Sequence, residues 1–170
     1  VLVVFFVAHG GVQAVVLAVI GVIFYLLLGQ EWISIQDDTA AYLQPTGITG
    51  VMPVYPMFLF GIKSIFGESL QLDMVVIIQS VIAIICTMIF SFYIQQQFRL
   101  KFAETVLIYI ACMLPFSIYL PETGITHQIL TEGLCYALFY PYFLFLLHYT
   151  LTKRTRYLAV SLLFAVLLAL

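Results

Sequence analysis

The sequence predicts an all-α fold, a polytopic transmembrane helical bundle with an interfacial helix in its first external loop. Composition is the first reason: 64% of the residues are hydrophobic and 8% are charged, whereas roughly 25% of a soluble domain is charged. The mean hydropathy of +1.16 indicates that lipid solvates most of the surface. The third reason is the length of the apolar runs, several of which approach the roughly 20 residues that a spanning helix needs.

Five apolar segments predict the spanning helices. Residues 1–8 either extend the first of them or form a separate piece before Gly10 and Gly11. The fourth contains Pro141, which we expect to kink its helix, because proline removes a backbone hydrogen bond yet is tolerated in membrane helices. The fifth is shorter than a full span. The expected spans are about 12–29, 73–95, 102–120, 127–150 and 157–170.

Basic residues in short loops predict the orientation, because cytoplasmic loops are enriched in Lys and Arg. Glu104 is expected to pair with Lys101 or Arg99 at the cytoplasmic end. The loops at 30–55 and 121–126 carry acidic residues and no basic ones, so both are expected to be external. The basic side chains of the two predicted cytoplasmic loops are Arg99, Lys101, Lys153, Arg154 and Arg156.

The apolar segment at 54–66 is predicted to lie in the outer interface. If the chain leaves the membrane outward near residue 30 and re-enters from outside near residue 73, this segment does not cross. Its helix, about 56–66, would be only roughly 17 Å long. Pro56 suits the first helical turn and Gly67 suits the C-terminal stop. Lys63 would extend toward the headgroups, and a buried hydrophobic hairpin is the alternative interpretation.

Composition also limits the domains and partners. We expect residues 1–170 to belong to a single transmembrane domain, since no linker or repeat interrupts them, and to be its N-terminal part, since the last apolar run stops short of a full span. The net charge of −2 argues against a nucleic-acid partner. Cysteines at 86, 112 and 135 all lie in apolar runs, which indicates reduced packing residues rather than disulfides.

Asp37 and Asp38 are the first candidates for chemistry. They form a carboxylate pair in a chain with eight acidic residues among 170. Their loop lies between a predicted span and the predicted interfacial helix, so the pair should lie close to the membrane surface. One Asp could cap a short helix over residues 39–44 while the other faces a cleft. A solvated turn is the alternative.

Glu132 and His127 are the next candidates. Glu132 should lie roughly 8 Å below the external surface in the fourth span, and acidic residues at such depth usually face a wet cavity. A Glu that simply reaches water is the alternative, and His127 could be a plain capping residue. Together with the two aspartates and Glu122, these side chains could bind a divalent metal, although no closely spaced ligand motif is present. Aromatic residues such as Tyr55 could stack on a sugar or prenyl chain, but packing is the simpler interpretation.

Several short motifs, in order, resemble a known family. The motifs are Asp38 with Tyr42 four residues later, the Pro-x-Tyr-Pro-x-Phe-Leu stretch at 53–59 with Phe66-Gly67, Gln79, Pro115, and Ile-Leu-Thr-Glu at 129–132. The chain resembles the N-terminal half of integral-membrane glycosyltransferases of the GT-C fold. The resemblance is to the protein O-mannosyltransferase-like group (glycosyltransferase family 39), which includes lipid A aminoarabinose transferases.

The resemblance implies an inverting transfer of a sugar from a polyprenyl-phosphate donor to a hydroxyl on a lipid, glycan or protein acceptor. It implies an integral membrane enzyme of the bacterial inner (plasma) membrane, with its active site on the external face. Asp38 would be the general base, and Glu132 would orient the site or bind the acceptor. Lys63 would contact phosphate, and Tyr42 and His127 would line the substrate site. A fragment of this length is expected to be inactive alone.

One departure from the family pattern leaves two candidates for the general base. Members often carry Asp-Glu in the loop, whereas Thr39 follows Asp38 here. Asp37 is therefore a supporting residue, or the base itself if the loop is one residue longer. The alternative function is a non-catalytic transporter or lipid flippase that uses Glu132 as a coupling residue.

Overall fold

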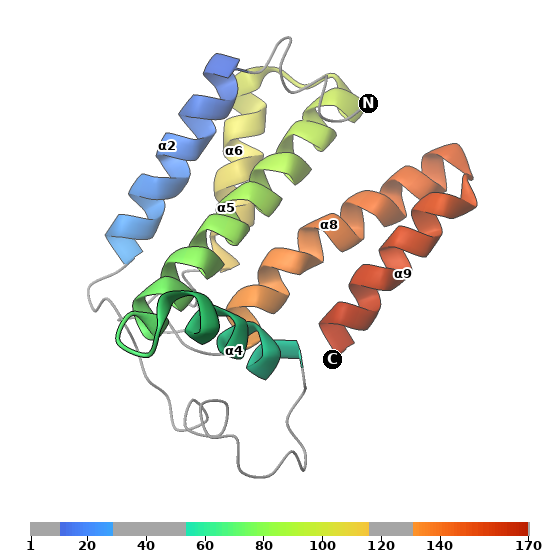
Figure 1. The fold of residues 1–170 in the computed structure, drawn as a ribbon. Coiled ribbons are helices and arrows are strands. Elements are labelled where there is room, and N and C mark those ends of the chain that lie inside the picture. Colours follow the sequence, from blue (N-terminus) through green and yellow to red (C-terminus); the bar gives the residue numbers. More distant parts are fainter. Residues whose placement is uncertain (1–10, 29–53, 116–130, 170) are drawn as a thin grey trace.

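The computed structural model describes residues 11–28, 54–115 and 131–169, and every regular element in these ranges is an α-helix. The predicted all-α class is thus confirmed for the described part of the chain. The helices are α2 (Gly11–Leu28), α4 (Val54–Phe66), α5 (Gln71–Phe98), α6 (Phe102–Met113), α8 (Thr131–Thr152) and α9 (Thr155–Ala169) (Figure 1).

These helices start and stop close to the expected positions. The short helix α4 begins at Val54 rather than at residue 56. Helix α6 ends at Met113, before Pro115, whereas its span was expected to reach residue 120; residues 116–130 lie outside the described part. Helix α8 runs as one helix from Thr131 to Thr152 with Pro141 inside it, so the expected kink stays a prediction.

Helix α5 is the centre of the arrangement. It contacts α2, α4, α6 and α8, and α9 packs on α8. Consecutive long helices alternate in direction, so the α5–α6 and α8–α9 turns lie at one end of the bundle and α4 lies at the other (Figure 1). We call these the basic end and the α4 end. The basic residues of both turns therefore lie on the same side, as the orientation argument from sequence requires.

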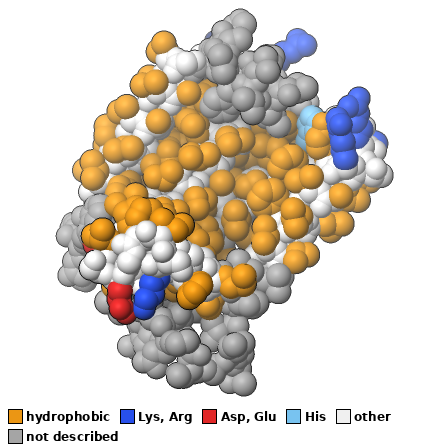
Figure 2. All heavy atoms as spheres, viewed as in Figure 1, with side chains coloured by type: hydrophobic (Ala, Val, Ile, Leu, Met, Phe, Trp, Pro, Cys, Tyr) orange, Lys and Arg blue, Asp and Glu red, His pale blue; other side chains and the backbone are white. Residues whose placement is uncertain are grey.

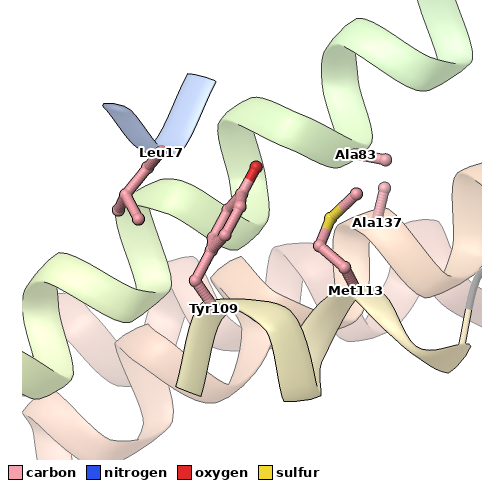
Figure 3. Packing of buried hydrophobic residues seen from close by; sticks show 5 residues of the cluster. All are labelled: Leu17, Ala83, Tyr109, Met113 and Ala137. Atoms are coloured by element: carbon pink, nitrogen blue, oxygen red, sulfur yellow. The ribbon is translucent and has the colours of Figure 1, made fainter. Parts of the chain in front are cut away.

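The core between α2, α5, α6 and α8 combines large and small side chains. Leu17, Ala83, Tyr109, Met113 and Ala137 form its buried cluster (Figure 3). Gly21 of α2 allows the close approach of Tyr109: a Cβ there would overlap the tyrosine hydroxyl and lie 3.0 Å from Ile84 Cγ1. Small residues at helix contacts let backbones approach closely, which is the common means of packing helices in membranes.

The bundle buries several polar side chains and exposes many large apolar ones, unlike a typical soluble protein. Helix α5 buries Gln71, Gln79, Ser80, Thr87 and Ser91. Large apolar side chains instead cover the outside (Figure 2), among them Val12, Leu27, Ile65 and Leu107, each more than two-thirds exposed. By length and composition alone, α5 and α8 could each cross a membrane, and the other four described helices are shorter apolar ones.

Three turns between helices use the left-handed backbone conformation. Gly67 follows α4 with φ 81°, Arg99 follows α5 with φ 54°, and Lys153 follows α8 with φ 56°. Each donates its N–H, or that of the next residue, to a carbonyl of the last helical turn, as in Leu100 N to Gln95 O at 2.9 Å. This conformation suits glycine, and other residues pay about 1 kcal/mol to adopt it.

Candidate functional site at the α4 end

Helix α4 is held against the bundle by one face. Tyr55, Leu59 and Ile62 recur at intervals of four and three residues, so they share a face, and this face is buried against Val75 of α5. The other face, with Met57, Phe60 and Ile65, is exposed. A helix that is apolar on both faces but covered on only one fits the surface of a bilayer better than water.

Two buried glutamines of α5 fix the position of α4. The Gln79 amide donates to Tyr55 Oη at 2.9 Å, and the Gln71 amide donates to the Leu59 carbonyl at 3.3 Å. Gln79 and Tyr55 are both almost completely buried. Tyr55 is therefore a packing residue that orients α4, in line with the simpler of the two sequence interpretations, and its ring does not lie on an open surface.

The start of α8 lies against the same cluster. Leu134 packs on the buried residues shared by α4 and α5, and Glu132 is two residues earlier, in the first turn of α8. Because this first turn of α8 lies at the α4 end, the backbone of Glu132 is close to α4. Its side chain lies outside the described part of the structure.

Lys63 is the candidate site residue whose side chain is described. It is exposed near the end of α4, and its Nζ forms an ion pair with Glu68 Oε1 at 2.8 Å. The hydrogen bond from Lys63 and then its positive charge lower the pKa of the Glu68 carboxyl. A phosphate at Lys63 would therefore compete with Glu68 for the ammonium group.

The remaining site predictions lie outside the described residues. Asp37, Asp38, Tyr42 and His127 all fall there, so a pocket shared by the aspartates and Glu132 stays a prediction. Within the described ranges, no three His, Cys, Asp or Glu side chains gather as a metal site requires. The residues suggested as metal ligands are not among the described side chains, so the divalent-metal hypothesis also stays open.

Sequence reasoning missed two features of the described part. The Gln79–Tyr55 bond was not anticipated, although two glutamines eight residues apart in an apolar helix share a face and signal buried polar contacts. Glu104 was expected to pair with a basic side chain. Instead, its carboxylate accepts the Lys101 backbone N–H at 2.8 Å and caps α6, because the orphan N–H groups at a helix start compete for a nearby carboxylate.

Comparison with protein-family models, with curated proteins and with solved structures finds no match.

Proposed function

We propose that this chain is part of a polytopic membrane protein in which α2, α5, α6, α8 and α9 span the bilayer and α4 lies at its external surface. Three observations support the proposal: the outer faces are largely apolar, several polar side chains of α5 are buried, and the basic turns lie at one end. Lys and Arg favour the cytoplasmic side, so the α4 end is external.

The chain acts, in this proposal, as the N-terminal part of a glycosyltransferase that moves a sugar from a polyprenyl phosphate to an acceptor hydroxyl. The supporting observation is the convergence of motif residues at the α4 end. Tyr55, from the Pro-x-Tyr-Pro-x-Phe-Leu motif, accepts a hydrogen bond from Gln79 of α5. Helix α8 begins beside them at Thr131, within the Ile-Leu-Thr-Glu motif. Segments that resemble the family in sequence thus supply neighbouring elements of one end.

The reaction needs a base, a bound acceptor and a stabilised leaving group. Asp38, or Asp37 in the alternative register, takes the acceptor proton as the acceptor oxygen attacks the anomeric carbon. The bond from that carbon to the lipid phosphate oxygen breaks at the same time, and the phosphate leaves with the electron pair, inverting the configuration. Glu132 orients the acceptor. Lys63, released from Glu68, neutralises the phosphate, and a bound divalent metal would supply further positive charge there.

Substitution of the loop aspartates tests this function. In the full-length protein, Asp38→Asn should lower sugar transfer at least about 100-fold, the usual scale for a general base, while membrane insertion stays normal. The assay is transfer of labelled sugar from a polyprenyl-phosphate donor in isolated membranes. Normal transfer by the Asp37→Asn, Asp38→Asn double variant would exclude the catalytic role.

A transporter or flippase is the second candidate. The buried polar side chains along α5, including Gln79, Ser80, Thr87 and Ser91, favour it, because polar residues inside membrane helices often mark a substrate or ion path. In that case Glu132→Gln should abolish flux across vesicles, whereas Asp38→Asn should change it little. The opposite pattern supports the transferase.

A further inference from the structure

The two turns at the basic end share a local pattern. In each, an exposed apolar residue comes shortly before a basic residue in the left-handed conformation, Phe98 before Arg99 and Leu151 before Lys153. Further basic residues follow within three positions of each. All five basic side chains at these turns are exposed: Arg99, Lys101, Lys153, Arg154 and Arg156.

The conformation of Arg99 and Lys153 makes their charge informative. Gly67 occupies the matching turn position at the α4 end, as is usual, because glycine has no Cβ to clash in this backbone region. At the basic end, the same position holds a long cation twice. The helix dipole favours a cation at a helix C-terminus, but it disfavours one at a helix start. Lys101 and Arg154 directly precede α6 and α9, so the positive charge of these turns has another use.

The surroundings of these cations fit an anion attached to hydrocarbon. Between residues 91 and 115 and between 146 and 169 the sequence has one acidic residue, Glu104, and its carboxylate is bonded to the Lys101 backbone. Arg156 is held beside Tyr157, donating to its hydroxyl at 2.9 Å. Exposed Phe98 and Leu151 offer contact to acyl chains, which a free phosphate ion would not use.

We infer that the α5–α6 and α8–α9 turns bind the headgroups of anionic phospholipids, with Arg99 and Lys153 as the central phosphate contacts. This inference rests on the proposed membrane placement and is independent of sugar transfer. Anionic lipid at the cytoplasmic surface would anchor both hairpins and fix the depth of the bundle. Juxtamembrane basic residues attract such lipids additively, each contributing to the binding energy.

The test uses the purified full chain in an uncharged detergent. Dioctanoyl phosphatidylglycerol is titrated while the thermal unfolding midpoint is recorded. Dioctanoyl phosphatidylcholine and inorganic phosphate are titrated in parallel. We expect the anionic lipid to raise the midpoint at the lowest concentration, because a ligand that binds only the folded state stabilises it. Equal effects of the two lipids would overturn the inference, as would an equal effect of phosphate alone.

Two sets of variants locate the binding. The pair Arg99→Gly, Lys153→Gly should need a roughly thirtyfold higher concentration of phosphatidylglycerol, while its midpoint without lipid should not fall, since glycine suits both turns. The charge-preserving pair Arg99→Lys, Lys153→Arg should behave like the parent chain. If the glycine pair does not fold, Arg154→Gln, at an exposed position, should show a smaller weakening.

The α4 end supplies the decisive comparison. Lys63→Gln removes a basic side chain there. If this variant loses the phosphatidylglycerol response and the glycine pair keeps it, the lipid binds at the α4 end and the inference is wrong. A response to an added acidic peptide, with none to the lipid, would also overturn it and point to a protein partner. If the chain binds the lipid but transfers no sugar, the lipid-binding inference is supported and the proposed transferase function is not.

Discussion

The two ends of the bundle reverse the chain with the same backbone conformation but stabilise it differently. At the α4 end, Gly67 makes the turn, and buried side-chain hydrogen bonds from Gln71 and Gln79 hold α4 against α5. At the basic end, Arg99 and Lys153 make the turns and are exposed, while the Tyr93 hydroxyl lies 3.0 Å from His148 Nδ1 between α5 and α8. Both ends therefore have contacts between helices, and the basic end differs by presenting a group of exposed charges outward.

The difference indicates at which end substitutions should leave the fold intact. Buried hydrogen bonds and packed apolar groups lose stability when one partner is removed. Exposed charges contribute little to folding and act mainly on external partners. Substitutions at the α4 end should consequently change stability, whereas those at the basic end should change binding to the surroundings.

The largest effect is expected for Leu59→Ala. Leu59 is buried between α4 and α5, so truncation leaves a cavity and should lower the free energy of unfolding by about 2–5 kcal/mol. Its neighbour Phe60 is 71% exposed, so Phe60→Ala is the matched control, and its free energy of unfolding should hardly change. Denaturant unfolding in mixed micelles measures both, and equal losses would show that α4 does not pack by this face.

Removal of the glutamine contact should have the next largest effect. Gln79→Leu leaves the buried Tyr55 hydroxyl without this donor, which should cost about 1–3 kcal/mol. Tyr55→Phe should cost a similar amount, and the double variant should cost less than the sum because the two groups interact. Strictly additive losses in a double-mutant cycle would mean that the hydrogen bond at 2.9 Å contributes nothing.

Alanine at the turns compares the two ends directly. Gly67→Ala forces a Cβ into the left-handed region and should cost about 1 kcal/mol. Arg99→Ala replaces one residue that has a Cβ with another, so the free energy of unfolding of this variant should stay within about 0.5 kcal/mol of that of the parent. Thermal unfolding of both variants checks this, and a larger loss at Arg99 would give its side chain a structural role.

The smallest effect concerns the Lys63–Glu68 ion pair, which is exposed. The pKa of the Glu68 carboxyl is lowered in the folded chain. Any stability from this carboxylate is therefore present above its ordinary pKa of 4.5 and is lost as the pH falls through the lowered value. The Glu68→Gln variant should therefore differ from the parent only above that range, and added salt should remove the difference. Unfolding of both chains as a function of pH measures it; a difference confined to lower pH would contradict the assigned direction.

Much of the architecture could be predicted because it depends on local and compositional information. Apolar runs determine where helices form, Pro56 lies in the first turn of α4, and Gly67 follows its last residue. The basic residues indicate which turns share an end. The candidate catalytic aspartates were reached in the same way, from charge placement and motif order, and they lie outside the described residues.

What the sequence determined by itself is therefore the helical class, the approximate helix positions and the distribution of charge, because each is encoded within a few neighbouring residues. Only the tertiary structure decided that Gln79 bonds Tyr55 across 24 positions, that Tyr109 packs where Gly21 lacks a side chain, and that Leu134 brings the start of α8 to α4. Such contacts depend on how helices are turned and spaced relative to one another. Neither quantity can be read from periodicity when a helix is apolar on every face.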